Sequence, residues 1–264
     1  MPISKSRYFI VLFIAFELTT IVARARAQSD STESSADVAT PVEPLPPGID
    51  EATLFAQLLT HNELRNAALA GYTEQRTYAV TDTTGKVRAQ ESGQMEYHAP
   101  DMKMFTTTSE SGSGIVRRLA LNPLIASEIE AASGKQHHDS SVTPANYKFK
   151  LLGEQQVGPY HCFVVQATPM RPDKYLFEGK VWIDADDFGI ARIAGHPAKK
   201  LSFWIERADF VREYQRIDGF WLPQKDETFV QVRLYGKKVL VIDHQSYTLT
   251  AATPTDESAQ SAQR

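Results

Sequence analysis

Three short segments carry residue types that could bind a metal or perform catalysis. Residues 184–189 (Asp-Ala-Asp-Asp-Phe-Gly) bring three carboxylates together as a calcium loop does. The twelfth position counted from Asp184 is Gly195, however, where such a loop needs a bidentate glutamate. Turn chemistry between two strands explains the acidic segment better. His137-His138-Asp139 also offers metal ligands, but adjacent residues rarely converge on one ion without partners from elsewhere. We therefore predict no metal site.

The candidate nucleophiles are also poorly placed for catalysis. Residues 111–114 (Ser-Gly-Ser-Gly) lack the strand–Gly-x-Ser-x-Gly–helix arrangement of a nucleophile elbow. The single cysteine, Cys162, lies in the apolar segment 160–165, which is typical of a buried strand residue rather than a reactive thiol. No glycine-rich phosphate loop is present in the sequence. We expect no enzyme and no cofactor; a hydrolase that uses His137 and His138 with nearby acids is a weaker alternative.

The first 27 residues have the three parts of a secretory signal peptide. Lys5 and Arg7 precede an apolar run over residues 8–16, and residues 25–27 (Ala-Arg-Ala) have small side chains at both positions that signal peptidase reads. The apolar run is shorter than the ~20 residues of a transmembrane helix. We expect cleavage after Ala27, with no nearby cysteine to carry a lipid anchor.

The charge of the chain disfavours nucleic acid as a partner. Its 28 basic and 32 acidic residues give a formal net charge of −4. Loss of the first 27 residues, with four basic residues and one acidic residue, removes three positive charges and leaves −7. Nucleic-acid-binding proteins usually present a basic face, and an acidic protein is not attracted to anionic membranes over long distances. Residues 28–48 and 251–264 are polar, and we predict a disordered linker and a disordered tail around one domain over residues 49–250.

The domain is predicted to begin with helices and to continue mainly as strands. Asp50 is a plausible N-cap for an amphipathic helix with Leu54 and Leu58 on its apolar face, and Gly71 is expected to end a second helical piece over residues 62–70. Asn122 is expected to cap another helix over residues 123–131. Alternation and turn residues predict nine or ten antiparallel strands, at about residues 72–80, 86–98, 101–108, 147–152, 160–167, 175–183, 190–194, 201–214, 221–234 and 239–249.

The alternation gives each strand one apolar and one polar face. Met95 and Tyr97 share a face, and a longer strand places Phe177 with Val181 and Ile183. The segment 201–205 is expected to turn Phe203 inward with Leu201 and Ile205. We predict a mainly β (α+β) protein, in which a curled antiparallel sheet forms an incomplete barrel with short helices over its concave side. An apolar cavity under those helices would suit a lipid; alternatively, side chains fill the space as an ordinary core.

Several segments resemble the LolA/LolB-like family of outer-membrane lipoprotein-sorting proteins. The resemblance covers most of residues 50–250 as a pattern and rests on segments 72–85, 90–93, 97–105, 181–184 (Val-Trp-Ile-Asp) and 218–223 (Asp-Gly-Phe-Trp-Leu-Pro). It implies a curled half-barrel in the periplasm whose cavity takes acyl chains of lipoproteins or other hydrophobic ligands. It implies that helix 123–131 is a lid. It also matches Arg76 to a basic residue that members of the family often carry in the first strand, and the Arg76 side chain is expected either to face the cavity or to be solvated on the strand.

The resemblance and the alternation disagree about one strand. The resemblance places Phe105 in the cavity, whereas strict alternation favours Met102 and Met104. Both options therefore remain among the predicted cavity-lining residues, which are Met95, Tyr97, Met104, Phe105, Leu124, Ile125, Phe177 and Phe203.

The resemblance gives two functional hypotheses. The first is a soluble, monomeric periplasmic carrier that binds lipoprotein acyl chains or another hydrophobic ligand, receives it from or passes it to a membrane-protein donor or acceptor, and performs no chemistry. The second is an envelope sensor or interaction module of the same fold that binds a membrane-protein partner. Bound lipid in the purified protein would favour the first hypothesis.

Overall fold

A computed structural model describes residues 42, 50–132, 141–173 and 175–252 of the chain. The predicted signal peptide, nearly all of the predicted linker, the segment His137–Asp139 and the tail beyond residue 252 lie outside the described residues. No helix among the described residues is long and apolar enough to cross a membrane.

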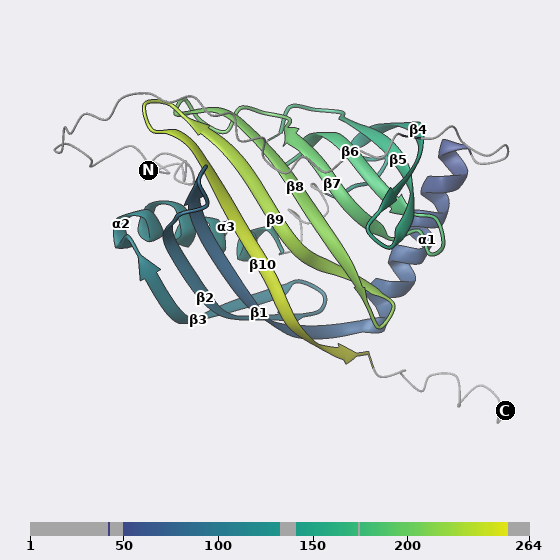
Figure 1. The fold of residues 1–264 in the computed structure, drawn as a ribbon. Coiled ribbons are helices and arrows are strands. Elements are labelled where there is room, and N and C mark those ends of the chain that lie inside the picture. The colour runs from purple at the N-terminus through teal and green to yellow at the C-terminus, as the bar shows by residue number, and fades with distance from the viewer. Residues whose placement is uncertain (1–41, 43–49, 133–140, 174, 253–264) are drawn as a thin grey trace, which may run out of the picture.

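Ten antiparallel strands form one open sheet, which confirms the predicted fold class. The strand order is β3-β2-β1-β10-β9-β8-β7-β6-β5-β4, and β3 and β4 stand at its two edges without closing a barrel (Figure 1). The strands are β1 (Leu69–Asp82), β2 (Val87–His98), β3 (Met102–Gly112), β4 (Tyr147–Val157), β5 (Tyr160–Pro169), β6 (Phe177–Asp184), β7 (Ile190–Pro197), β8 (Ile205–Ile217), β9 (Phe220–Val232) and β10 (Gly236–Ala251).

The first helix is longer than the sequence pattern predicted. Asp50 is its N-cap, as expected, and its Oδ1 accepts a hydrogen bond of 2.7 Å from the backbone N–H of Thr53. Helix α1 (Glu51–Ala68) runs unbroken into β1, so the expected helix end at Gly71 is wrong. Gly71 instead lies within β1, where a Cβ would stand only 2.4 Å from the carbonyl oxygen of Tyr97 on β2. The glycine therefore permits close strand pairing and not a helix cap.

The second helical region also begins earlier than expected. It consists of α2 (Gly114–Val116), the π-helical turn η1 (Arg117–Leu121) and α3 (Asn122–Ala131), which follow one another without a break. Ser113 caps this run, because its side chain accepts a hydrogen bond from the N–H of Val116. Asn122 has helical backbone angles and is not a cap.

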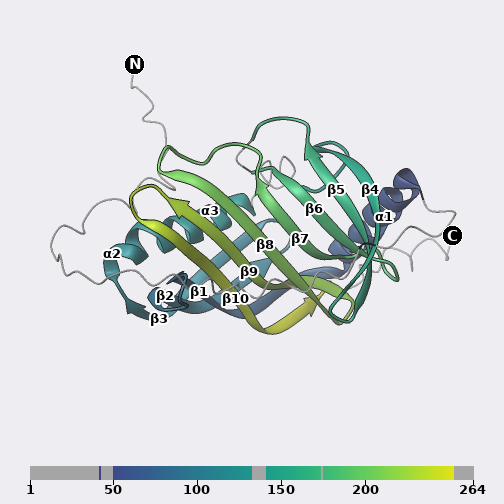
Figure 2. The same cartoon turned by 45° about the horizontal axis from the view of Figure 1, so that its top comes forward.

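Both helical regions cover the same face of the sheet but at opposite ends. In Figures 1 and 2, α2 and α3 lie beside β2 and β3, whereas α1 lies beside β4 and β5. Under α1, Leu54, Phe55 and Leu58 are buried against residues of β4–β7. Under η1 and α3, Leu121 and Ile125 are buried with residues of β1, β2 and β10. We call this side of the sheet the helix-covered face.

The strand register shows which side chains share that face. One row of directly paired residues crosses from β4 to β2, and its members all lie on the helix-covered face. The row is apolar on β4–β7 and charged on β8 and β9, and it continues with isoleucine on β10, tyrosine on β1 and glutamate on β2. In order from β4 to β2, its members are Leu151, Val165, Val181, Ile193, Arg212, Asp226, Ile242, Tyr78 and Glu91. The two apolar regions under the helices are therefore separated by a charged middle.

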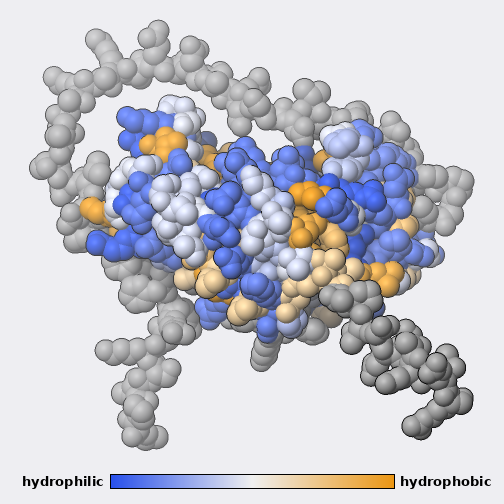
Figure 3. Space-filling model, turned by 90° about the horizontal axis from the view of Figure 1, so that it is seen from below, coloured by the Kyte–Doolittle hydropathy of each residue, from blue (hydrophilic) through white to orange (hydrophobic). Residues whose placement is uncertain are grey.

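The opposite face is not uniformly polar, which differs from the expected alternation. On β5, β6 and β7, a third cluster buries Cys162, Val164, Trp182 and Ala191, with Trp221 packed against it. The surface that Figure 3 shows from below carries apolar side chains in small groups separated by polar ones. The interpretation of Cys162 as a buried strand residue is confirmed.

The acidic segment after β6 is a turn. The Oδ1 atom of Asp184 accepts hydrogen bonds from the backbone N–H groups of Asp186 (3.1 Å) and Asp187 (3.0 Å). Asp187 in turn accepts a hydrogen bond of 2.8 Å from the indole N–H of Trp221. These contacts confirm the expected turn chemistry.

The buried position of Cys162 gives a direct prediction. Burial raises the pKa of the Cys162 thiol to about 12, because a thiolate there would lack solvation. We expect no reaction with a thiol-specific chromogenic disulfide at pH 8 in the native protein and one equivalent after denaturation in guanidinium chloride. Rapid native labelling would contradict the buried placement.

Candidate functional site

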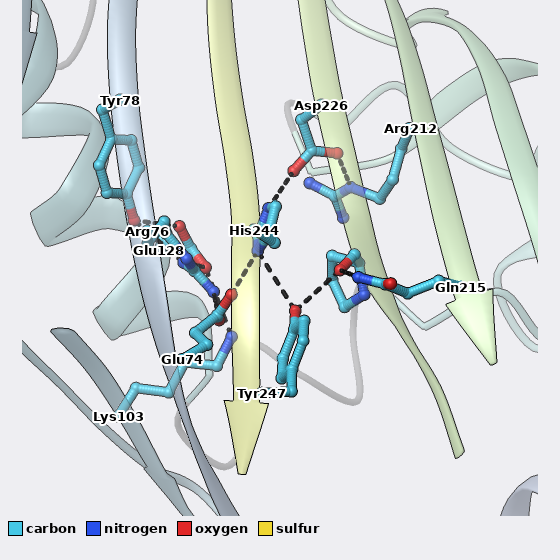
Figure 4. A network of polar contacts seen from close by, with 11 residues as sticks. Glu74, Arg76, Tyr78, Lys103, Glu128, Arg212, Gln215, Asp226, His244 and Tyr247 are labelled. Atoms are coloured by element: carbon cyan, nitrogen blue, oxygen red, sulfur yellow. Dashed lines mark hydrogen bonds and ion pairs between the residues drawn. The ribbon is translucent and has the colours of Figure 1, made fainter. Parts of the chain in front are cut away.

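A network of charged and aromatic side chains occupies the middle of the helix-covered face. It extends from α3 across β1, β10 and β9 to β8 (Figure 4). We call it the polar network, and its members are Glu74, Arg76, Tyr78, Lys103, Glu128, Arg212, Asp226, His244 and Tyr247. Because it is built from residues far apart in the sequence, it exists only when the sheet and α3 are assembled.

At one end of the network, Glu128 ties α3 to the sheet. Its carboxylate accepts hydrogen bonds from Arg76 and from the Tyr78 hydroxyl (2.9 Å), both on β1. The ammonium group of Lys103 on β3 lies 3.4 Å from the same carboxylate. The helix is therefore attached to two strands by charge as well as by the apolar contacts of Leu121 and Ile125.

The centre of the network is a buried chain of alternating charges. Arg76 donates to Glu74, and the Nδ1 atom of His244 lies 2.9 Å from the other oxygen of Glu74. The Nε2 atom of His244 lies 3.3 Å from Asp226, which also accepts from the Nε atom of Arg212. Because ions without partners are costly to bury, this pairing is what permits charge here.

The pKa values in the network follow from these contacts. Burial alone would raise the pKa of Glu128, but the positive charges of Arg76 and Lys103 outweigh it and lower that pKa to about 2. Burial alone would lower the pKa of His244, but its hydrogen bonds to Asp226 and Glu74 raise it. The network thus favours an ionised Glu128 and a protonated His244.

Water reaches one side of the network more than the other. The side chains of Arg76 and Glu74 are fully buried. By contrast, the side chains of Lys103, Glu128 and Arg212 are 20, 26 and 46% exposed. The part of the face between α3 and β8 is therefore accessible to solvent, and an arriving ligand would meet these three side chains first.

The register answers the question left open for β3. Phe105 is paired with the buried Met95 and packs against Tyr78 with ring centroids 5.3 Å apart. Met104 is 52% exposed and occupies the alternate position on β3, so its prediction as a cavity-lining residue is not supported by its placement. Of the two alternatives, Phe105 is the one that lies on the helix-covered face.

Most of the other predicted lining residues also lie on the helix-covered face. Leu124 and Ile125 belong to the cluster under α3. Tyr97 lies beside Tyr72 on the neighbouring strand, with ring centroids 5.2 Å apart. Phe177 belongs instead to the cluster under α1, so the predicted residues do not form a single group.

Phe203 does not join either cluster. It is 61% exposed, and the guanidinium of Arg233 lies 4.4 Å from its ring centroid. Strand β8 begins only at Ile205, so the residues before it do not follow the alternation expected for segment 201–205. This placement contradicts the expectation that Phe203 points inward.

Sequence reasoning missed nearly all of the polar network. Only Arg76 was singled out, as a basic residue of the first strand. The signal that could have found it is the alternation along β1. Glu74 and Arg76 occupy the same alternate positions as Tyr72, Tyr78 and Val80, which form the buried face of that strand. Charged residues at positions where the alternation predicts buried apolar side chains indicate a buried polar cluster.

Two hollows lie away from the network. One, of about 680 Å³, is lined by β5–β9 residues that include Trp182, Val211 and Phe229; the other, of about 390 Å³, follows β7 around residues 196–209. None of the eight predicted lining residues contributes to either hollow.

No family model and no curated protein sequence matches the chain. Among solved structures, it is similar to a putative outer membrane lipoprotein-sorting protein domain from Vibrio parahaemolyticus, with 13% identity, a TM-score of 0.43, and coverage of 76% of this chain and 94% of that one. A LolA superfamily protein from Nitrosomonas europaea is 8% identical with a TM-score of 0.34, and the match covers 78% of this chain and 96% of that one.

A DUF1329 family protein from Desulfovibrio piger is similar as well. It is 12% identical with a TM-score of 0.41, and the match covers 79% of this chain and 98% of that one. These are likenesses of fold at low identity, and none of them assigns a ligand to this chain.

The shifted pKa values predict how stability depends on pH. Because the pKa of Glu128 is lowered from 4.5 to about 2, its stabilisation is complete above about pH 4.5 and is lost as the pH falls toward 2. Because the pKa of His244 is raised above 6.5, its stabilisation is complete below about pH 6.5 and is lost as the pH rises through the folded value. From these two groups, the free energy of unfolding is expected to be greatest between pH 4.5 and 6.5.

Replacing Glu128 tests this assignment. In Glu128→Gln, the free energy of unfolding at pH 6 should fall by about 2 kcal/mol, and its decline between pH 4.5 and 2 should be smaller than in the unmodified protein. Glu63 is an exposed residue of α1, so Glu63→Gln is the control and should change neither quantity. Equal behaviour of the two variants in urea titrations would contradict the role of Glu128.

Proposed function

We propose that the protein is a non-catalytic carrier that binds the acyl chains of a lipoprotein, or another lipidic ligand, on the helix-covered face. The observation that supports this most is that apolar side chains on that face remain partly exposed around both buried clusters. Under α1 they include Phe149, Leu151, Phe210 and Tyr214; under α3 they include Phe105, Leu124, Ile129 and Leu240. Each methylene of a ligand that these surfaces bury is worth about 0.8 kcal/mol.

The attachment of α3 suggests how a ligand would enter and leave. The helix contacts the sheet through a small apolar cluster and the contacts of Glu128, rather than through a continuous core. Movement of α3 would expose more of the apolar surface on β1–β3. Transfer would then be passive, because the ligand moves to whichever acceptor buries it better.

The predicted signal peptide supports a location outside the cytoplasm, and the resemblance points to the periplasm. There, an acidic, monomeric carrier would exchange its ligand with a membrane-protein donor or acceptor through specific contacts rather than through attraction to anionic lipid. Nucleic acid is not an expected partner.

Changing one residue of α3 tests the proposal. In Leu124→Glu, a charge replaces a partly buried apolar side chain, and we expect the bound lipid to fall at least fivefold while the melting temperature falls by no more than a few degrees. Lipid is measured by mass spectrometry of organic extracts of the purified protein. Leu64, 66% exposed on α1, provides the control Leu64→Glu, which should retain its lipid.

Lipid-free extracts of the unmodified protein, from repeated preparations, would count decisively against a carrier. Equal loss of lipid and of stability in Leu124→Glu would instead identify Leu124 as ordinary core.

A second function, binding of a membrane-protein partner, is favoured by the open edge of β3. Among the described residues no strand pairs with this edge, residues 106–112 are exposed, and the Arg117 side chain donates only to the last two carbonyls of the strand, those of Ser111 and Gly112. At the other edge, the Glu51 side chain of α1 accepts a hydrogen bond of 2.8 Å from the Leu151 N–H of β4. An uncovered edge strand is a ready site for strand addition by an extended segment of another protein.

Photocrosslinking distinguishes this interaction module from a carrier. A photoreactive residue at position 108 on β3 should form an adduct with one membrane protein in intact cells, whereas one at position 148 on β4 should not. Thr108 and Lys148 are both exposed, so the two sites are matched. Equal labelling at both sites, or none, would remove the case for strand addition.

A further inference from the structure

Arg212 is the most accessible cation of the polar network. On β8 it is two positions from Phe210 and two from Tyr214, so the three side chains point to the same face of the sheet. Both aromatic residues pack against the cluster under α1. Arg212 therefore shares the helix-covered face with both aromatic residues, and it also donates a hydrogen bond to the Tyr214 hydroxyl. Asp226 accepts from Nε, one of the five N–H donors of an arginine, and the side chain is still 46% exposed.

The other partly exposed cation of the network already lies against a carboxylate. Lys103 projects from β3 onto the helix-covered face, and its ammonium group lies 3.4 Å from the Glu128 carboxylate. Its side chain is also less exposed than that of Arg212, at 20% against 46%. Arg212 is therefore the cation of the network that an incoming anion meets first.

The acidic groups of the network are already engaged. Glu128 accepts from Arg76 and Tyr78, and Glu74 accepts from Arg76 and contacts His244. Asp226 contacts both Arg212 and His244. An incoming anion therefore meets the exposed donors of Arg212 on the open side, while each carboxylate already lies against a cation.

An apolar wall begins directly beside Arg212. Ile193 on β7 is its direct partner in the strand register. Phe210 lies edge-to-face on Phe177, with ring centroids 5.7 Å apart, and this pair continues into the buried cluster under α1. A chain attached to an anion at Arg212 would thus find apolar surface on β6–β8.

We propose that Arg212 binds the anionic headgroup of the ligand, a carboxylate or phosphate, while the acyl chain lies along Phe210 and the neighbouring apolar wall. This inference rests on the proposed carrier function and specifies its ligand as an amphipathic anion. A charge-assisted hydrogen bond to an arginine is among the stronger polar contacts in proteins, and a bidentate one also fixes the orientation of the headgroup.

The test compares an anionic with a neutral ligand of the same chain length. Palmitate and hexadecanol are each used to displace the fluorescent dye N-phenyl-1-naphthylamine from the purified, delipidated protein. We expect Arg212→Gln to raise the apparent Kd of palmitate about tenfold, the effect of one lost charge-assisted hydrogen bond. The apparent Kd of hexadecanol should change less than twofold.

The chain offers a matched control at Arg207. This residue is also on β8 and also donates from its Nε to an aspartate, Asp209, but its side chain is 75% exposed and belongs to no part of the polar network. Arg207→Gln should leave both ligands unaffected. Because Arg212→Gln leaves Asp226 without its arginine, the double variant Arg212→Gln/Asp226→Asn is measured as well, and it should lose palmitate selectively in the same way.

The outcomes separate the inference from the function on which it rests. If both ligands displace the dye and neither Arg212 variant alters palmitate relative to hexadecanol, the headgroup site is wrong and the carrier remains. If neither ligand binds, both are wrong. Inorganic phosphate alone is tested by calorimetry: Arg212-dependent binding in the absence of an acyl chain would overturn the lipid assignment in favour of a free-anion site, and no measurable binding supports it.

Discussion

The need to pair buried charges is the constraint on which this structure depends. Glu74 and Arg76 are fully buried on β1, and an unpaired ion at such a position costs several kcal/mol. Each has a partner supplied by a different part of the chain: His244 from β10 and Glu128 from α3. Correct strand order and correct docking of α3 are therefore required together, since either error would leave a charge without its partner.

The same constraint divides the helix-covered face. In a typical antiparallel sheet with one covered face, apolar side chains would continue across it. Here the charged row at Arg212 and Asp226 interrupts them, so each helix covers its own apolar cluster and the sheet between them is not sealed by a common core. A face of this kind offers both apolar surface and charge to a ligand, which is why an amphipathic molecule suits it better than a purely apolar one.

The sequence was sufficient for the strands but not for their partners. Alternation depends on local spacing, so it predicted nearly all of the strands and the inward orientation of Met95 and Phe177. It could not decide between Met104 and Phe105, because apolar residues occur on both faces of β3. The inward residue is identified only by the pairing of Phe105 with Met95. Gly71 was misinterpreted for a related reason: its role depends on the nearness of Tyr97, 26 positions along the chain.

The pairing of residues within the polar network was beyond sequence reasoning because its contacts are long-range. Glu74 and His244 are separated by 170 positions, and a single sequence carries no signal that joins them. The predicted inward orientation of Phe203 was wrong for a different reason. The short segment before β8 has the alternation of a strand but does not pair as one. Residues whose surroundings are local were thus predicted, and those whose surroundings are assembled by the fold were not.

Methyl NMR with a bound long-chain ligand tests the central claim most directly, because methyl groups report which face of the sheet is occupied. Ile193 and Ile242 lie on the helix-covered face in the same register row as Arg212, whereas Val211 and Val164 point to the opposite face. Titration with palmitate should shift the methyl signals of Ile193 and Ile242 and leave those of Val211 and Val164 in place. Shifts at Val211 and Val164 alone would locate binding on the wrong side of the sheet and contradict the account.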